Sequence, residues 1–170
     1  MQFVGLNKVY AGEPLPNGVK DAGATAAMQA WAKITQPYQG GVTANFSMPT
    51  SNDFYREGES EPFYSAVDST SATKEITYEV ADMDDETMAF YFGTKEPQEG
   101  KIYEGVKGFA FVSNSGVTMA FARLKYTAII TGTMSSSEPM RISVSAKVLA
   151  PENGGVAWWP LKGDIFETEE

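Results

Sequence analysis

The chain repeatedly alternates apolar and polar residues, and this period of two limits the folds that it can adopt. The clearest example lies between Met140 and Leu149, where Ile142, Val144, Ala146 and Val148 alternate with serine, lysine and arginine residues. Successive side chains of a β-strand point to opposite faces, so the alternation predicts a strand with one buried face. The segment from Leu124 to Met134 has a similar pattern, and the two segments together predict a long hairpin.

Shorter segments of the same kind predict further strands. Their expected ranges are 3–9, 28–36, 42–48, 63–67, 76–80, 102–103, 109–113, 117–122 and 156–160. The tight connection Asn114-Ser115-Gly116 is typical of a turn that joins two strands of a hairpin. About eight to ten strands at this spacing are typical of sandwiches and barrels. The expected fold class is therefore mainly β, an antiparallel β-sandwich or barrel with one flanking helix.

The flanking helix is expected from about residue 83 to residue 92. Four acidic residues at its start are Asp82, Asp84, Asp85 and Glu86. Their carboxylates lie where the first turn of a helix leaves backbone N–H groups unpaired, and Gly93 is suited to end the helix. Apolar residues, among them Met88 and Tyr91, fall on more than one side of this helix. We therefore expect it to be covered by more than one sheet face or by a second subunit.

The length of 170 residues suits one domain with a substantial core. We assign this domain to residues 1–163 and expect the acidic tail, residues 164–170, to be flexible. The sequence has no run of 18 or more apolar residues and no charged segment followed by an apolar one at its start. The protein is therefore expected to be soluble and cytoplasmic when made.

Two residue types that carry much of enzyme chemistry are missing. The sequence contains neither cysteine nor histidine. This excludes disulfides, thiolate nucleophiles, Ser-His-Asp triads and metal sites built on thiolate or imidazole ligands. Carboxylate-only and lysine-based mechanisms remain open. We predict no enzyme activity, no cofactor and no metal.

The acidic groups could form a metal or catalytic site, or they could have a structural role. The cluster that begins at Asp82 lacks the spacing of a calcium-binding loop, so helix capping explains it better. Glu57, Glu59 and Glu61 alternate, and on an extended segment they would align on one side, as a glycosidase pair requires. The fragment from Gly105 to Gly108 lacks the spacing of a phosphate-binding loop and is expected to be loop.

Charge is unevenly distributed along the chain, whose formal net charge is −9. Residues 52–104 carry 14 acidic and 4 basic residues, whereas residues 105–163 carry 6 basic and 2 acidic residues. The two regions are either solvated faces of one domain or surfaces that associate head to tail between copies. Because phosphate neutralisation needs Lys and Arg, an acidic protein is a poor candidate for holding nucleic acid.

A long polar connection is expected over residues 49–62, and it exposes two aromatic residues. Connections of this length usually make contacts or act as lids. Adjacent strand residues face opposite ways, so Trp158 and Trp159 are expected as one core residue and one rim or interface residue. The residues predicted to take part in self-assembly are Phe54, Tyr55, Glu57, Glu59, Glu61, Met88, Tyr91, Arg123, Lys125 and Arg141.

Several segments, taken in order, resemble a known family. They are the loop residues 59–62 (ESEP), the strand 76–81 (ITYEVA), the acid-led helix 82–92, and the hairpin residues 122–124 (ARL) and 148–151 (VLAP). Between about residues 50 and 151 the chain resembles the major tail tube proteins of long-tailed bacteriophages and prophages. The fold of that family is similar to the tube protein of type VI secretion.

The resemblance implies a β-sandwich or barrel with a flanking helix, assembled into hexameric rings that stack as a hollow tube. Its implied partners are further copies of the chain, other phage tail proteins, and DNA that passes through without specific binding. No membrane partner is implied, and the protein would pass from the bacterial cytoplasm to the virion tail. A ligand-binding β-barrel for sugar or lipid is the second hypothesis, and a carboxylate-dependent hydrolase is the third.

Overall fold

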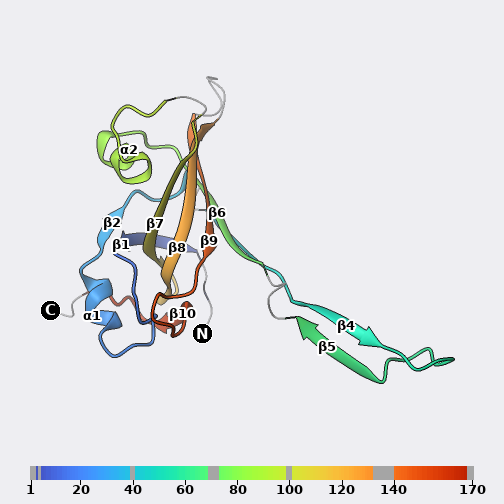
Figure 1. Cartoon of the computed structure of the whole chain (residues 1–170). Helices are drawn as coiled ribbons and strands as arrows, with labels where there is room; N and C mark the ends of the chain where they lie inside the picture. Colours follow the sequence, from blue (N-terminus) through green and yellow to red (C-terminus); the bar gives the residue numbers. More distant parts are fainter. Residues whose placement is uncertain are drawn as a thin grey trace.

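The computed structural model describes residues 3, 5–38, 41–68, 73–98, 101–131 and 140–167, which form ten strands and two helices (Figure 1). In chain order the elements are β1 (Leu6–Gly12), α1 (Ala24–Gln29), β2 (Ala32–Ile34), β3 (Val42–Phe46), β4 (Thr50–Phe54), β5 (Tyr64–Asp68), β6 (Lys74–Val80), α2 (Asp85–Phe92), β7 (Tyr103–Ser113), β8 (Val117–Thr131), β9 (Arg141–Val148) and β10 (Trp158–Lys162). The prediction of a mainly β, antiparallel architecture is confirmed. None of the described helices is both long and apolar enough to cross a bilayer.

Strand β8 connects the two ends of the molecule. On one side it pairs with β7 along most of its 15 residues. On its other side the partner changes, from β10 at residues 117–121 to β9 at residues 124–131. The larger sheet runs in the order β2-β1-β7-β8-β9-β6-β3, with antiparallel pairing throughout. The segments predicted as 117–122 and 124–134 therefore belong to one strand as far as Thr131, and residues 132–139 lie outside the described residues.

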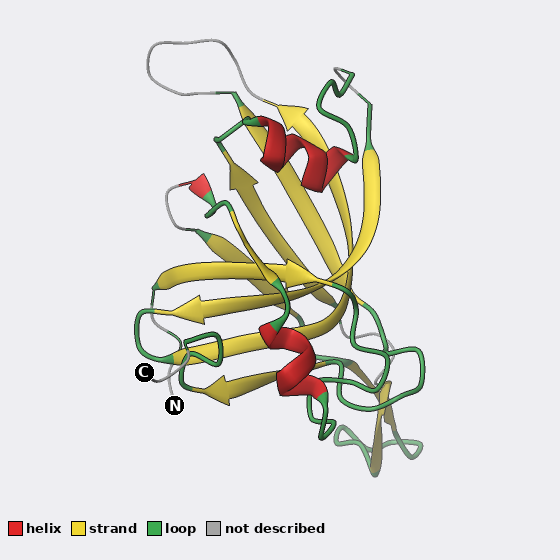
Figure 2. Ribbon diagram, turned by 90° about the vertical axis from the view of Figure 1, so that its left-hand side faces the viewer, coloured by secondary structure: helices red, strands yellow, loops and turns green. Residues whose placement is uncertain are grey.

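The sheet curls around its own apolar side. The pairing of β7 with β8 shifts register between Lys107 and Phe109, and such bulges bend a strand and increase its twist. Figure 2 shows the curled sheet with α2 across one end and α1 near the other. In Figure 1 both helices lie on one side of the sheet, while β4 and β5 extend away on the opposite side. The sheet therefore has an inner face, covered by helices, and an outer face.

Aromatic rings from α2 and from the strands fill the space inside the curl. Tyr91 of α2 meets Tyr78 and Tyr126 edge to face, with ring centroids 6.3 and 6.0 Å apart. The hydroxyls of Tyr78 and Tyr91 lie 2.9 Å apart, and the Tyr126 hydroxyl donates to the Phe90 carbonyl at 3.1 Å. Burial raises the pKa of all three tyrosines, so they remain neutral hydrogen-bonding groups.

A second apolar cluster centres on Trp31, which follows α1. Its indole lies directly over Gly12 and Gly108, where an added Cβ would come within 2.2 and 2.4 Å of the ring. The indole N–H donates to the Glu13 carbonyl at 3.0 Å. The prediction that residues 105–108 form a loop is wrong, since they belong to β7. Gly108 is needed there for the approach of Trp31, and Gly105 lies under the Tyr126 ring.

The prediction of a strand over residues 28–36 is wrong for its first part. Residues 24–29 form α1, and only Ala32 to Ile34 are in a strand. Ala24 and Met28, four residues apart, are both buried on one side of α1. Gly23 makes no side-chain cap, so α1 depends on this packing and on the helix preference of alanine.

Helix α2 confirms the predicted helix, with its first turn two residues later than expected. Asp84 is the N-cap, and its carboxylate accepts the Thr87 backbone N–H at 2.8 Å. This hydrogen bond lowers the pKa of Asp84. Gly93 ends the helix in the left-handed conformation with φ 68°. The Thr87 hydroxyl also lies 2.7 Å from that of Thr35, which ties the helix to the connection after β2.

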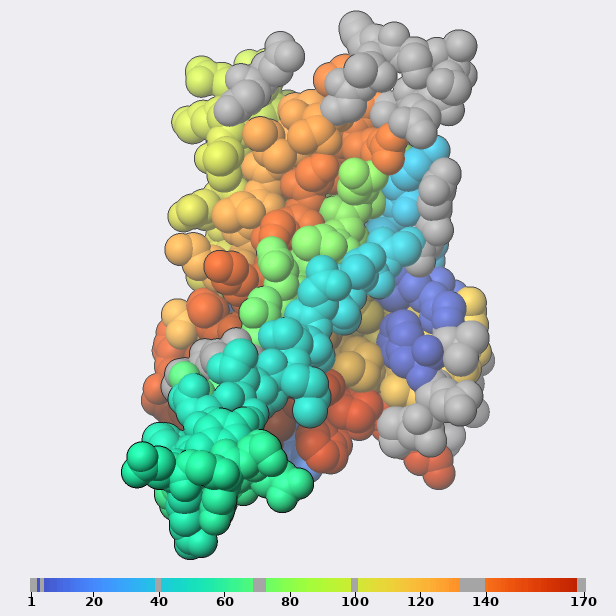
Figure 3. Space-filling model, turned by 90° about the vertical axis from the view of Figure 1, so that its right-hand side faces the viewer, coloured from blue at the N-terminus to red at the C-terminus, as the bar shows by residue number. Residues whose placement is uncertain are grey.

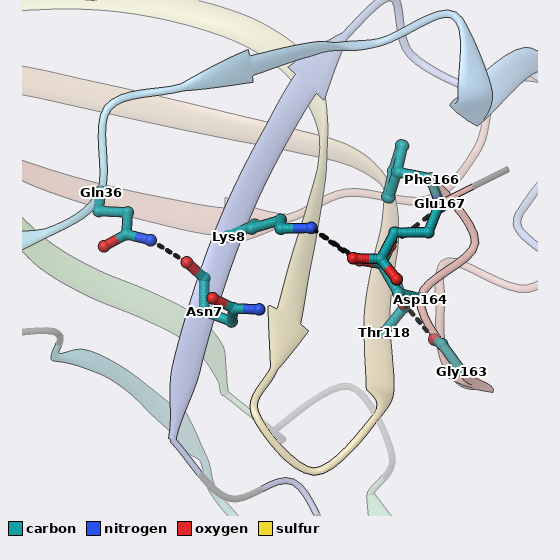
Figure 4. Close-up of polar contacts among 8 residues, drawn as sticks. All are labelled: Asn7, Lys8, Gln36, Thr118, Gly163, Asp164, Phe166 and Glu167. Atoms are coloured by element: carbon teal, nitrogen blue, oxygen red, sulfur yellow. Dashed lines mark hydrogen bonds and ion pairs between the residues drawn. The ribbon is translucent and has the colours of Figure 1, made fainter. Parts of the chain in front are cut away.

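Residues 163–167 pack against β1, whereas flexibility was expected from residue 164. Lys8 Nζ lies 2.8 Å from a Glu167 carboxylate oxygen and 3.3 Å from one of Asp164 (Figure 4). These hydrogen bonds, that to Glu167 first, raise the pKa of Lys8 to about 12. The Phe166 ring stacks on Tyr10 with centroids 3.7 Å apart. Residues 168–170 of the tail lie outside the described residues.

We predict that Asp84→Ala destabilises the protein because the Thr87 N–H loses its acceptor. The stability that this cap contributes depends on the negative charge of the Asp84 carboxylate. The folded-state pKa of that carboxylate is below its ordinary value of 3.8. The difference in unfolding free energy between the variant and wild type is therefore largest above pH 3.8, and it disappears as the pH falls through the lowered folded-state pKa. Urea unfolding, monitored by tryptophan fluorescence, measures this difference in free energy. Asp82→Ala, at an exposed position before the cap, is the control, and an equal effect of both variants would contradict the assignment.

Candidate self-association surfaces

Strands β4 and β5 form a separate hairpin, which we call the arm (residues 50–68). They pair with each other over five residues each, and among the described strands neither pairs with the larger sheet. Figure 1 shows the arm extending away from the body. At its base the Ser47 N–H donates to the Thr73 carbonyl at 2.9 Å, and the Thr73 N–H donates to the Ser47 hydroxyl at 2.7 Å. The arm is therefore an ordered projection from the body.

The prediction of a polar connection over residues 49–62 is wrong for its first part, because residues 50–54 form β4. Their sequence, TSNDF, lacks apolar alternation. The strand is instead set by its partner. Phe54 lies across from Tyr64 with ring centroids 6.0 Å apart, and the Ser65 hydroxyl donates to the Asp53 carboxylate at 2.6 Å. Both contacts need β5, which confirms the strand predicted at residues 63–67.

The arm exposes a set of large apolar side chains. They are Phe54, Tyr55, Phe63, Tyr64 and Val67, each between 49 and 64% exposed. Monomeric proteins rarely expose so many large apolar residues together, and such patches usually mark interaction sites. The arm is two strands thick and has no core of its own, so no part of it buries these side chains. Another surface must cover them if they are to leave water.

The arm is also acidic. Residues 50–68 contain five acidic residues and one basic residue, Arg56. Glu57 and Gly58 form a turn, in which Gly58 has φ 81° and the Glu59 N–H donates to the Arg56 carbonyl at 3.1 Å. Glu57, Glu59 and Glu61 therefore do not align along an extended segment. They surround the arm tip with negative charge.

The outer face of the larger sheet carries a row of hydroxyl groups across four strands. The register places Thr43 opposite Thr77, Thr77 opposite Ser145, and Ser145 opposite Thr127. Figure 3 views this face, with the arm in front of its lower part. Beside the row, Arg141 binds the Glu79 carboxylate at 2.6 Å and lies over the Tyr38 ring at 5.1 Å.

A hollow of about 510 Å³ lies over this row. Its lining combines five threonine and serine residues with apolar groups, and it includes Arg141, Glu79 and Tyr38 as well as Ile102. Because Arg141 is already paired with Glu79, the hollow has no strong net charge. Hydroxyls of this kind suit a small polar molecule. Among the described residues no group of three or more acidic side chains is placed to hold a metal ion.

A strip of basic and aliphatic side chains, which we call the basic strip, crosses the outer face at β7, β8 and β9. Val106 lies opposite Lys125, and Lys125 lies opposite Lys147. Two like charges directly opposite each other are destabilising. Lys125 has an acidic neighbour, Glu104, at 3.8 Å, and both side chains are at least half exposed. Lys147 lies opposite Glu75 of β6. Arg123, next along β8 on the same face, completes the strip.

Arg123 and Ile102 add two features to this region. The Nε of Arg123 is buried and has no hydrogen-bond partner within the part of the chain that the structure describes. One of its terminal nitrogens donates to the Ala150 carbonyl at a long 3.4 Å. Ile102, at the start of β7, is 62% exposed. Basic groups with incomplete pairing therefore lie beside exposed aliphatic side chains.

Several strand edges of the larger sheet are unpaired within the described ranges, and two of them belong to β3 and to the start of β7. Strand β3 pairs with β6 on one side only. The first five residues of β7 pair with β8, while β1 pairs with β7 only from Gly108 onward. These edges lie at opposite ends of the five-stranded region β7-β8-β9-β6-β3. Unpaired edges of this kind are templates for pairing with another chain.

The ten residues predicted for self-assembly fall into three groups. Phe54, Tyr55, Glu57, Glu59 and Glu61 lie on the arm, and Arg123, Lys125 and Arg141 lie on the outer face. Tyr91 requires a correction, because it is buried at 2% exposure and hydrogen-bonds Tyr78. Met88 is partly buried against the core. The folded monomer covers the apolar sides of α2 with its own sheet.

Sequence reasoning missed Phe63, Tyr64, Val106 and Lys147 as surface residues. The Phe-Tyr pair at residues 63–64 repeats the pair at residues 54–55, and this symmetry about the acidic turn was the signal for a hairpin. Trp158 and Trp159 are divided as predicted, with Trp158 against Phe121 in the core and Trp159 exposed. No protein-family model matches the chain, and no curated protein matches it.

We predict that replacing residues 50–68 with a short Gly-Ser linker leaves the body folded and its thermal midpoint within a few degrees of wild type. The arm adds no described strand to the larger sheet, so its removal costs the core no packing. Near-ultraviolet circular dichroism and calorimetry on dilute protein measure this. A loss of cooperative unfolding would show that the arm is part of the core.

Proposed function

We propose that this chain is a structural subunit that associates with copies of itself, and that the assembly is a phage or prophage tail tube. In this proposal hexameric rings stack into a hollow tube through which DNA passes. Its other partners are the remaining tail proteins, and the subunit moves from the bacterial cytoplasm into the virion tail. The observation that carries the proposal is the arm, with its uncovered aromatic side chains.

The apolar surface of the arm supports association between copies. Phe54, Tyr55, Phe63 and Tyr64 are aromatic, and aromatic residues dominate the energetics of protein interfaces. The arm points away from its own body, so a surface on another molecule must cover it. A structural subunit in a repeating assembly always has such a surface nearby, because every neighbour is a copy of itself.

The sheet edges support an assembly that repeats. The unpaired edges of β3 and of the start of β7 are different surfaces at opposite ends of the five-stranded region β7-β8-β9-β6-β3. Contacts between unlike surfaces are heterologous, and they produce closed rings or open filaments instead of simple dimers. Rings that stack need one further contact along the stack, and the arm is suited to supply it.

The charge of the protein supports a conduit over a nucleic-acid binder. The formal net charge is −9, and Glu75, Glu79 and Glu104 offset the basic residues on the outer face. A surface that does not neutralise phosphates has little affinity for DNA, because that affinity comes from counterion release by Lys and Arg. DNA would move past such a surface without being held.

The hollow on the outer face favours a second candidate function, the binding of a small polar ligand such as a sugar. Its hydroxyls and the ring of Tyr38 are groups that sugars commonly contact. Titration calorimetry against a panel of neutral mono- and oligosaccharides tests this candidate. Saturable binding that Ser145→Val abolishes would support it over self-assembly.

We predict that light scattering of the wild-type protein rises with concentration and that electron microscopy then shows rings or tubes. The double variant Tyr55→Ser, Phe63→Ser should need at least about tenfold more protein to associate, because it removes two central aromatic contacts. Trp159→Ser removes another exposed aromatic residue, from β10, and is the control. A wild-type protein that stays monomeric at every concentration would contradict the proposal.

A further inference from the structure

We infer that the arm of one copy docks on the basic strip of a second copy, over Val106, Lys125 and Lys147, with Arg123 and Ile102 beside them. The inference rests on the proposed self-association and names its two surfaces. The arm supplies aromatic side chains and carboxylates, and the strip supplies aliphatic side chains and ammonium groups. The occupant of the strip is therefore the same chain, in another copy.

Charge favours the basic strip over other surfaces of this acidic protein as the docking site of the arm. The arm carries five acidic residues and one basic residue, and the whole chain has a net charge of −9, so most of the body repels the arm. On the strip, Lys125 and Lys147 lie directly opposite each other, and together with Arg123 they outnumber their two acidic neighbours, Glu104 and Glu75. An acidic side chain from outside would relieve the repulsion between the two lysines. Glu57, Glu59 and Glu61 provide three such carboxylates at the tip of the arm.

Apolar contact supports the same pairing. Two large aliphatic side chains are exposed in β7 or immediately before it. They are Ile102, which is 62% exposed, and Val106, which is 36% exposed. Val106 lies opposite Lys125, and Ile102 lies four residues before Val106, with Glu104 between them. Aromatic side chains of the arm would cover both. The unpaired edge at Tyr103 to Lys107 lies alongside and offers backbone groups to a strand of the arm.

The two surfaces are placed for contact between molecules. The arm leaves the body from β3 and β6, and the strip crosses β7, β8 and β9, so the base of the arm lies on the strand next to Lys147. In Figure 1 the arm points away from the body, so it does not fold back over its own strip. An arm-to-strip contact joins unlike surfaces, and repetition of it adds copies head to tail.

A charge exchange tests the inference. The arm variant carries Glu57→Lys, Glu59→Lys and Glu61→Lys, and the strip variant carries Lys125→Glu and Lys147→Glu. Each alone should associate at least about tenfold more weakly than wild type in sedimentation velocity, since it brings like charges together. A chain that carries both sets should recover association, because the charges are again opposite. Raising the ionic strength should weaken the wild-type contact.

Matched controls separate this contact from general charge effects. Lys33→Glu with Lys162→Glu changes the net charge as the strip variant does, at two exposed positions away from the strip, and should associate as wild type. Circular dichroism of each variant checks that it is folded. Failure of the combined variant to recover, when wild type associates, would overturn the strip as the docking surface while leaving self-assembly intact. A monomeric wild type would overturn both.

Disulfide trapping gives a second readout that does not depend on charge. The natural chain has no cysteine, so only introduced thiols can react. Tyr55→Cys protein mixed with Val106→Cys protein should give a cross-linked heterodimer on mild oxidation, since a disulfide needs Cα atoms within about 7 Å. Tyr55→Cys mixed with Trp159→Cys is the control. Equal yields from the two mixtures would contradict the assignment.

Discussion

The structure depends on the pairing of β8 with neighbours on both sides. β7 takes one side, and β10 and β9 divide the other, so the two ends of the molecule share one continuous strand. The bulge between Lys107 and Phe109 bends β7 at the point where the opposite partner of β8 changes. The sheet can then close around Tyr91, Phe109 and Tyr126, whose rings pack edge to face. Trp31 over Gly108 completes the packing at the other end.

This closure determines which apolar surfaces are left for other molecules. Most of the inner face is covered by the protein's own aromatic residues and by α2, and an apolar hollow of about 210 Å³ remains among residues of β1, β3, β6 and β8. The apolar side chains of the arm lie outside the core on two strands that have no layer behind them. Self-association gives these side chains a place to be buried, and the opposite charges of arm and strip give the association a direction.

Local patterns predicted the elements whose signals lie in their own residues. The alternation from Arg141 to Val148 predicted β9, and Asp84 with Gly93 predicted both ends of α2. α1 has no capping side chain, and its stability comes from tertiary contacts of Met28, so the alanines alone did not decide between helix and strand. β4 is a strand because β5 pairs with it. The basic strip required the register, since Val106, Lys125 and Lys147 are far apart in sequence and meet only across β7, β8 and β9.

Electron cryo-microscopy of the assembled protein, at a resolution that traces individual strands, would locate the arm of each copy. We expect each arm to lie across β7 and β8 of a neighbouring copy, with Glu57 to Glu61 near Lys125 and Lys147 and with the aromatic side chains covered. This expectation is contradicted if the particles are single molecules, or if assemblies form with their arms extended into solvent and the strip uncovered.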